Sequence, residues 1–459
     1  MLIRNADIHG RGIADLRIAG DRIAAIGTLP ARADEPVLEA RGGALLPGLH
    51  DHHIHLAALA ARRDSIPCGP PDVTDAAMLA DRLAIPGTGW IRGIGYHESV
   101  AGMLDRARLD RMVPGRPVRI QHRSGRMWFF NSAGLEIILS AADAPPGLDR
   151  ATGRLFDEDR WLRAALGGTP PDFAGVSAAL AAFGITGITD MSPANDPAMA
   201  AHFAAQQASG HLRQRVHLAG TLSLVEAAAT DRLTIGPAKL HLHEADLPDY
   251  DAAVAFIVAA HAQGRGVAIH CVSETELVFA LAALSEAGPR PGDRIEHASI
   301  APDTAMAEMA HMGLAVVSQP HFIAERGDQY REMVEPQSVP HLYRLRAFRD
   351  AGVTLAGGSD APFGEPDPWT AMHAAVSRRT RNGHAIGPDE ALSPEQALAL
   401  FLADPADLTR QRAVAVDAAA DLCLLDRPWE EARTRLSARD VRATILGGII
   451  LNDRVDQAP

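Results

Sequence analysis

Residues 43–56 read GALLPGLHDHHIHL, an apolar run that ends in a cluster of histidines. The run is typical of a strand, where His53 and His55 point to the same side because successive side chains alternate between the two faces. If this strand belongs to a barrel, both imidazoles can reach one cation inside it. Neutral imidazole is the commonest metal ligand, so the pair indicates a metal site. The spacing alone is a modest signal, because the chain has 20 histidines and a second such pair, His241 and His243, can arise by accident.

The middle of the chain alternates short apolar runs with alanine-rich stretches of helical period. This alternation is typical of βαβ units on a parallel barrel or sheet. From Lys239 onward the runs recur at intervals that fit the ~30 residues per unit of an eightfold (β/α) barrel. We therefore predict an α/β fold with eight strands of this kind. The predicted strands are GALLPGLHDHHIHL (43–56), PVRIQH (117–122), GITGITDM (184–191), AKLHLH (238–243), GVAIHC (266–271), RIEHAS (294–299), LAVVSQP (314–320) and VTLAGGSD (353–360).

Two stretches, near residues 57–117 and 132–180, are too long for a single helical crossover. We expect them to be insertions that cover the mouth of the barrel. The two ends of the chain consist instead of short alternating segments with Gly turns, which is typical of β-structure. The predicted organisation is an end domain of residues 1–45 plus 412–459 and a barrel domain of residues 46–411.

Composition limits the class of protein. The chain has 459 residues, 47% hydrophobic content and a net charge of −13, without a basic run or stripe. We therefore expect no nucleic-acid partner and no membrane partner. No stretch reaches the roughly 18 apolar residues of a transmembrane helix, and the N-terminus lacks the apolar segment of a signal peptide. Three widely spaced cysteines argue against a disulfide framework, so we expect a cytoplasmic protein that acts on a small molecule; homo-oligomerisation is left open.

Lys239 is the only lysine in a chain with 44 Lys and Arg residues, so all the other basic side chains are arginine. Arginine can replace a lysine that serves only as a solvated charge, but its guanidinium does not lose its proton. Reactions that need a neutral amine therefore require lysine. These reactions are Schiff-base formation, general-base catalysis, or reaction with carbon dioxide to give a carbamate. The alternative is that one lysine survived by chance. The residues around Lys239 must therefore show whether its amine has a function.

Three further polar residues stand at the ends of apolar strands: His270 in VAIHC, His297 in RIEHA and Asp360 in LAGGSD. Barrel enzymes carry their chemistry at the C-terminal ends of their strands. A core histidine or a helix cap explains any one of these residues, but not all of them together with residues 43–56. Lys239 lies in another strand, where an ammonium would repel a divalent cation and be costly to bury. A carbamylated lysine is instead an anion with two oxygens, which can bridge two metals or bind one.

The stretches PGLHDHHIHL (47–56) and GGSDAPF (357–363), with the strand lysine and the strand-end histidines between them, resemble the amidohydrolase superfamily. Further stretches resemble its amidohydrolase 3 or YtcJ-like branch, which includes N-substituted formamide deformylases. The likeness runs from about residue 40 to the C-terminus and fixes order and spacing as well as residue types. The stretches that carry it are GWIRGIGY (89–96), PVRIQHRSGRMWFFNS (117–132), RIEHASIAPDTAMAEMAHMGLAVVSQPHF (294–322), LYRLRAFRDAGVTLAGGSDAPFGEPDPW (342–369) and LSPEQALALF (392–401).

The resemblance implies a metal-dependent hydrolase in which a (β/α)8 TIM-like barrel is joined by a small β-sandwich built from both chain ends. It implies hydrolysis of a carbon–nitrogen bond, of amide or formamide type, in a small non-peptide substrate by metal-activated hydroxide. Zinc is the expected metal, as one or two divalent ions, although imidazole and carboxylate suit Fe, Mn and Ni alike. The matched positions are His53 and His55 on the first metal, carboxylated Lys239 as the bridging ligand, His270 and His297 on the second metal, and Asp360 as a metal ligand and general acid/base.

The sequence departs from this branch at two places that the resemblance puts near the substrate. Gly125 and Arg126 stand where members commonly have Gly-His, and HLHEADLP (241–248) follows the strand lysine where members have a Gly-containing segment. If Arg123 and Arg126 point inward, they can hold a substrate carboxylate in a bidentate fork. Two solvated loop arginines are the alternative. The candidate substrate-binding residues are Tyr96, His97, His122, Arg126, Trp128, Gln319 and His321.

Two other functions stay open at this point. Deamination of a ring amidine uses the same superfamily chemistry, but such deaminases usually manage with one metal and no carboxylated lysine, so Lys239 argues against it. A catalytically inactive scaffold that keeps the fold is the second alternative, and the presence of every expected ligand argues against it. Release of ammonia without a carboxylic acid would indicate deamination, and metal analysis would identify a scaffold.

Overall fold

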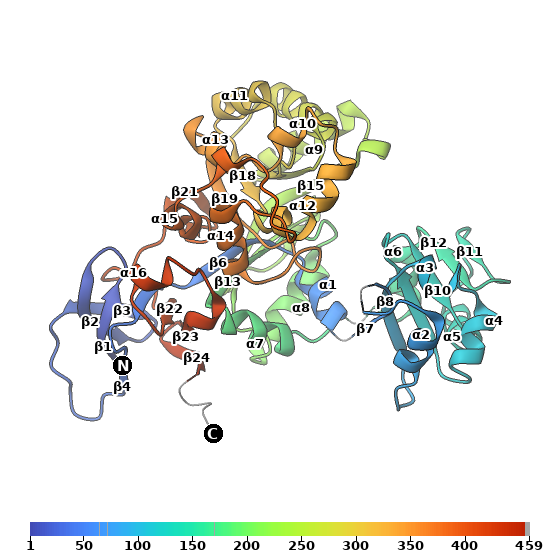
Figure 1. The fold of residues 1–459 in the computed structure, drawn as a ribbon, viewed down its shortest axis with the longest axis horizontal. Coiled ribbons are helices and arrows are strands. Elements are labelled where there is room, and N and C mark those ends of the chain that lie inside the picture. Colours follow the sequence, from blue (N-terminus) through green and yellow to red (C-terminus); the bar gives the residue numbers. More distant parts are fainter. Residues whose placement is uncertain (64, 71, 169, 455–459) are drawn as a thin grey trace. The chain divides into compact units, whose positions relative to one another are not determined.

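The chain forms two compact units (Figure 1). The first unit consists of residues Met1–Leu56 together with the chain from Asp172 onward. The second unit consists of residues Ala57–Pro171. The computed structural model describes residues 1–63, 65–70, 72–168 and 170–454.

The first unit contains a nearly closed barrel of eight parallel strands, which confirms the predicted barrel. The strands are β6 (Leu49–Ile54), β13 (Ile185–Asp190), β14 (Arg215–Gly220), β15 (Leu233–His241), β16 (Val267–Cys271), β17 (Arg294–His297), β18 (Ala315–Ser318) and β19 (Thr354–Gly357). Each strand pairs with the next one in this order. The ring closes between β6 and the segment after β19, where the N–H of Asp360 donates to the carbonyl of His53 (2.6 Å). The N–H of His55 likewise donates to the carbonyl of Ala361 (2.8 Å).

One of the eight predicted strands is wrong. The stretch PVRIQH forms β9 (Val118–His122), which belongs to a different sheet in the second unit. The strand that completes the barrel is β14, whose sequence RVHLAG is more polar than a typical buried strand. Its Arg215 is bound to Asp421 (2.6 Å), and its His217 lies 2.9 Å from the hydroxyl of Thr234. These contacts accommodate the polar side chains, and the sequence alone does not show them.

Helices alternate with most of the barrel strands. They are α7 (Ala174–Ala182), α8 (Pro197–Ala208), α9 (Tyr250–Ala262), α10 (Glu274–Ala287), α11 (Asp303–Met312), α12 (His321–Met333), α13 (Leu345–Asp350), α14 (Pro368–Ser377) and α15 (Pro394–Ala399). Helix α10 begins with a capping box in which the side chains of Ser273 and Glu276 each accept the other's backbone N–H. Within the described parts of the chain, no helix is long and apolar enough to cross a membrane.

The two chain ends form a separate sheet, as predicted. Its strands are β1 (Leu2–Ile8), β2 (Gly12–Ala19), β3 (Arg22–Gly27), β4 (Val37–Glu39), β5 (Ala44–Pro47), β22 (Leu422–Leu425), β23 (Val441–Leu446) and β24 (Ile449–Asp453), with α16 (Trp429–Ala432) between β22 and β23. Only Gly48 separates β5 of this sheet from β6 of the barrel. A Cβ atom on Gly48 would lie 2.3 Å from the side chain of Thr186, so the crossing requires glycine. The limits of this end domain, residues 1–45 and 412–459, stay a prediction.

The second unit has a sheet of its own, in the order β11, β12, β10, β9, β8, β7. The predicted insertions near residues 57–117 and 132–180 fall largely within this unit. Their role in covering the barrel mouth stays a prediction. The elements, besides β9, are α1 (Leu56–Arg63, which starts at the last residue of the first unit), β7 (Ile66–Pro67), α2 (Ala76–Leu83), β8 (Ile91–Tyr96), α3 (Glu98–Ala101), α4 (Arg106–Met112), β10 (Met127–Phe130), α5 (Ser132–Ala141), β11 (Leu148–Asp149), β12 (Arg154–Phe156) and α6 (Asp159–Ala165).

Candidate metal centre

His53, His55 and Asp360 come together where the barrel closes. The Nε2 atoms of the two histidines lie 3.4 Å and 3.2 Å from Oδ1 of Asp360. One ligand atom from each of the three residues lies within 4.8 Å of the other two. Imidazole nitrogen and carboxylate oxygen are both ligands of Zn²⁺, so this trio can hold one divalent ion.

His297 and His270 continue this cluster. The ring centre of His297 lies 4.7 Å from that of His53 and 4.5 Å from that of His270. His297 has a φ of +69°, a left-handed conformation that residues other than glycine rarely adopt. Adjacent residues on a regular strand face opposite sides, and this turn allows both Glu296 and His297 to face His53. The residues predicted for a second metal therefore lie beside those predicted for the first.

Three histidines of the cluster have a partner on Nδ1. The Nδ1 of His53 donates to Oε2 of Glu296 (2.5 Å), and the Nδ1 of His297 lies 2.7 Å from Oε1 of Gln319. The Nδ1 of His55 lies 3.1 Å from the hydroxyl of Ser192. A hydrogen bond that fixes the proton on Nδ1 leaves the lone pair of Nε2 for a metal, and such partners are typical of metal-binding histidines.

Among the described residues, the buried nitrogens without a hydrogen-bond partner include Nε2 of His297 and Nζ of Lys239, both close to the cluster. Lys239 is 4% exposed, and burial lowers its pKa to about 8. Buried polar atoms are normally hydrogen-bonded, so an unpartnered pair calls for an explanation. A cation bound to His297 and to a carboxylated Lys239 would supply it. The residues present therefore fit a divalent metal.

Burial and neighbouring charges shift the pKa values of the cluster in different directions. Burial opposes the charged form of His53, but the carboxylates of Glu296 and Asp360 outweigh it and raise the pKa of that ring. Burial, assisted by the nearby His53, lowers the pKa of His297 to about 3, and burial also holds the pKa of His270 far below its usual range. Burial opposes ionisation of Asp360, but its interactions with His53 and His55 outweigh burial and hold the pKa of that carboxyl well below its usual range. His297 and His270 are therefore neutral imidazoles and Asp360 is a carboxylate.

The sequence reading missed two residues that hold the ligands. Glu296 stands directly before His297 in RIEHAS, so its position at a strand end could have identified it as a candidate site residue. Ser192 follows β13, and nothing in the sequence indicates its contact with His55. That contact depends on the pairing of β6 and β13, which lie far apart in the sequence.

Two candidate substrate-binding residues belong to the barrel unit. Gln319 is fully buried, and its side-chain oxygen is engaged by His297. His321 is also fully buried, and its Nε2 lies 2.9 Å from the carbonyl oxygen of Ser359, next to Asp360. In this structure both side chains support residues of the metal centre, and a direct contact with substrate stays a prediction.

The other candidates lie in the second unit. Tyr96 and Trp128 are buried in its apolar core. Arg126 is largely exposed, and its Nε donates to Asp157 (2.8 Å). The Nε2 of His122 lies 3.0 Å from Oε2 of Glu98, and that of His97 lies 3.7 Å from the same oxygen. Arg123 is exposed. The proposed binding of a substrate anion by Arg123 and Arg126 stays a prediction.

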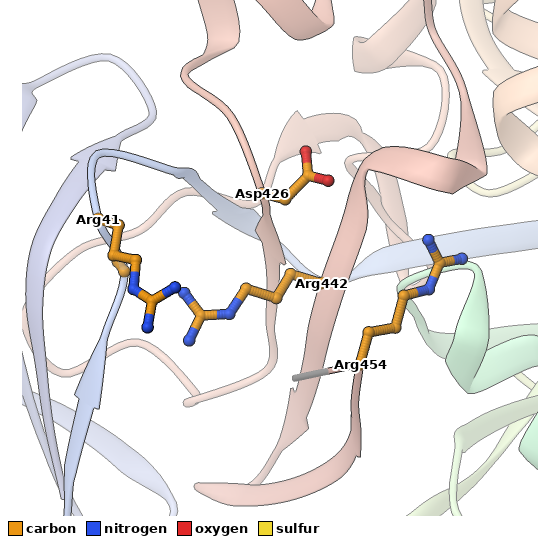
Figure 2. Close-up of a pocket in the computed structure, with 5 residues that line it drawn as sticks. Arg41, Asp426, Arg442 and Arg454 are labelled. Carbon is orange, nitrogen blue, oxygen red and sulfur yellow. The ribbon is translucent and has the colours of Figure 1, made fainter. Parts of the chain in front are cut away.

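A pocket in the end sheet contains none of the predicted site residues (Figure 2). One of its arginines, Arg442, donates through Nη1 to the carbonyl of Glu39 (2.6 Å). Another, Arg454, donates in the same way to the carbonyl of Arg439 (2.6 Å). The guanidinium groups of these two arginines hydrogen-bond to backbone carbonyls, a role that suits a group with several N–H donors. The residues that line the pocket are Ala40, Arg41, Asp426, Arg442 and Arg454.

A sequence model of the amidohydrolase family matches residues 37–451, which is most of the chain. The chain belongs to the amidohydrolase family. The resemblance to its amidohydrolase 3 or YtcJ-like branch is thereby confirmed.

Two curated amidohydrolase relatives align along nearly the whole chain. N-substituted formamide deformylase of Arthrobacter pascens is 26% identical over an alignment of 535 residues, gaps included, which covers 98% of this chain and 97% of that protein. The putative amidohydrolase YtcJ of Bacillus subtilis (strain 168) is 24% identical over 489 residues, covering 90% of each. Among solved structures, an uncharacterized metal-dependent hydrolase from Pyrococcus furiosus superposes with a TM-score of 0.76 at 20% identity, covering 93% of this chain and 98% of that one. This last similarity supports the fold.

The contact between Gln319 and His297 predicts a role in metal binding. Replacing Gln319 with Leu removes the acceptor for Nδ1 of His297, so the affinity of the substrate-free protein for zinc should fall by ~10–100-fold. Competition with a chromophoric chelator measures this affinity. The matched control is Gln263→Leu on the exposed end of α9, which should bind zinc like the parent. Unchanged zinc affinity in Gln319→Leu, with only KM altered, would instead place Gln319 on the substrate.

Proposed function

We propose that this amidohydrolase hydrolyses the carbon–nitrogen bond of a small, non-peptide amide of the formamide type. The observation that carries the proposal is that His53, His55 and Asp360 bring three ligand atoms close enough together to hold a metal ion. Next to these residues lie two buried nitrogens, of Lys239 and His297, that lack hydrogen-bond partners in the described structure. The similarity to an N-substituted formamide deformylase supports the substrate class.

We propose that six residues of the chain hold one or two divalent ions, and that the metal is zinc. When bound, such a cation supplies hydroxide at neutral pH and acts as a Lewis acid toward the substrate carbonyl. The chain's own contribution is to hold imidazoles and an ionised Asp360 at the end of the barrel, with the Nδ1 atoms of His53, His55 and His297 already engaged. The proposed ligands are His53, His55, Lys239, His270, His297 and Asp360.

Asp360 is the proposed general acid/base. Its Oδ1 lies near the Nε2 atoms of both His53 and His55, it is 7% exposed, and its low pKa keeps it ionised, as a proton acceptor must be. It takes a proton from the attacking water and delivers it to the leaving nitrogen as the carbon–nitrogen bond breaks. The water oxygen remains on the carbonyl carbon, so the products are a carboxylic acid and an amine.

Lys239 is proposed to act as a carbamate. Its neutral amine forms a bond to the carbon of carbon dioxide and releases one proton, which leaves an anion with two oxygens. The strand position and burial of Lys239 suit this reaction, because a buried ammonium without an acceptor is costly. A need for a carboxylated lysine also favours amide hydrolysis over the deamination of a ring amidine.

Replacing Lys239 tests this role. Lys239→Arg keeps a positive charge but cannot form a carbamate, so kcat/KM should fall by ~10³-fold, because metal-ion stabilisation is worth several kcal/mol. Lys239→Ala should be inactive and partly rescued by acetate or propionate, whose carboxylate can occupy the vacated place. Chloride at the same ionic strength is the control and should not restore activity. Full activity in Lys239→Arg would contradict the proposal.

A substrate panel tests the reaction itself. Purified zinc-loaded protein is assayed with N-substituted formamides, N-acyl amino acids, cyclic amides and a ring amidine, and products are identified by mass spectrometry. We expect turnover of an N-substituted formamide, with formate and an amine formed in equal amounts. Ammonia release from the amidine without any carboxylic acid product would contradict the proposal, and so would the absence of turnover and of bound metal together.

A further inference from the structure

Glu296 occupies an unusual position for a carboxylate. It is 0% exposed on β17, and its Oε2 accepts a hydrogen bond from Nδ1 of His53 (2.5 Å). Its other oxygen, Oε1, lies 2.6 Å from Nε of Arg294, which is itself 3% exposed. A charged carboxylate this deeply buried requires compensation, and Arg294 provides it.

The Arg294–Glu296 pair connects two strands that are not neighbours in the barrel. Both residues belong to β17, whereas His53 belongs to β6, and two strands, β18 and β19, separate them on the shorter path around the barrel. Arg294 also donates through Nη2 to the carbonyl of His52, directly before His53 (3.2 Å). The pair therefore holds both the ring and the backbone of the first histidine ligand from across the barrel.

Three proposed histidine ligands have an Nδ1 partner, and these partners differ in charge. His55 faces the neutral hydroxyl of Ser192, and His297 faces the neutral amide of Gln319. Only His53, of these three, has a carboxylate. A carboxylate on Nδ1–H fixes the ring and makes Nε2 a more basic ligand than a neutral acceptor does.

We propose that Glu296 is a positioning residue that orients His53 and strengthens its bond to the first divalent ion, with Arg294 as the counter-ion beside its buried carboxylate. This inference rests on the proposed function, since it takes the metal site as given. It assigns different tasks to the two members of the buried pair: Glu296 acts on the metal through His53, whereas Arg294 stabilises Glu296.

Two variants separate these tasks. Glu296→Gln keeps the shape and an acceptor oxygen but removes the charge, so the zinc dissociation constant of the substrate-free protein should rise ~10–100-fold. It also leaves Arg294 buried without a counter-ion, so the melting temperature of the metal-free protein should fall. Adding Arg294→Met removes the stranded charge but also the bond to the carbonyl of His52, so it should recover part of the lost melting temperature, while zinc binding stays weak.

Ser192→Ala is the matched control, because it removes the neutral partner of His55. Its effect on zinc affinity should be clearly smaller than that of Glu296→Gln. All four proteins, the parent included, are measured by chelator competition with zinc alone and by thermal unfolding without metal. These readouts do not depend on knowing the substrate.

Three results would overturn the inference: parent-like zinc affinity in Glu296→Gln, recovery of zinc affinity together with stability in Glu296→Gln/Arg294→Met, or an equal loss in Ser192→Ala. The second result would make the pair purely structural. If the parent protein binds no zinc, the proposed function fails along with the inference. If the parent binds zinc and hydrolyses an amide while Glu296→Gln binds zinc equally well, only the inference fails.

Discussion

The barrel closes through the peptide groups of the residues that carry the predicted metal ligands. The N–H of Asp360 donates to the carbonyl of His53, and the carboxylate of Asp51 accepts from both the N–H and the hydroxyl of Ser359. These bonds fix how β6 lies against the segment after β19. A slip of one residue would turn His53 and His55 away from the barrel interior, because side chains alternate along a strand. The same hydrogen bonds therefore close the barrel and set the positions of His53, His55 and Asp360.

The division of work between arginine and lysine follows from their chemistry. Arg378 and Arg265 are buried, and each donates to several backbone carbonyls, so their charge and hydrogen-bonding capacity are used for structure. Lys239 is equally buried but has no hydrogen-bond partner among the described residues. An ammonium in that place would be a poor structural element, whereas an amine that becomes a carbamate would have a function there. This contrast offers a physical explanation for the presence of a single lysine among so many arginines.

The sequence predicts the barrel well where strands are apolar and end in a polar residue, as for His53, His270 and Asp360. It fails for β14, because Arg215 and His217 make that strand look like a surface segment until their partners are known. It also assigns PVRIQH to the barrel, because an apolar run does not reveal which sheet it joins. The ligand positions can be predicted from strand ends, but the partners that orient them depend on packing between strands far apart in the sequence. The sequence therefore indicates Gln319 only as a substrate-binding candidate, and Glu296 only by its position next to His297.

The central claim is that Lys239 is modified and joins the two halves of the metal centre. A high-resolution crystal structure of the protein, prepared with zinc and bicarbonate, tests it most directly. We predict continuous density beyond Nζ of Lys239 for a planar carboxylate in contact with metal identified by anomalous scattering. Density that ends at Nζ, with metal bound only by His53, His55 and Asp360, would contradict the claim.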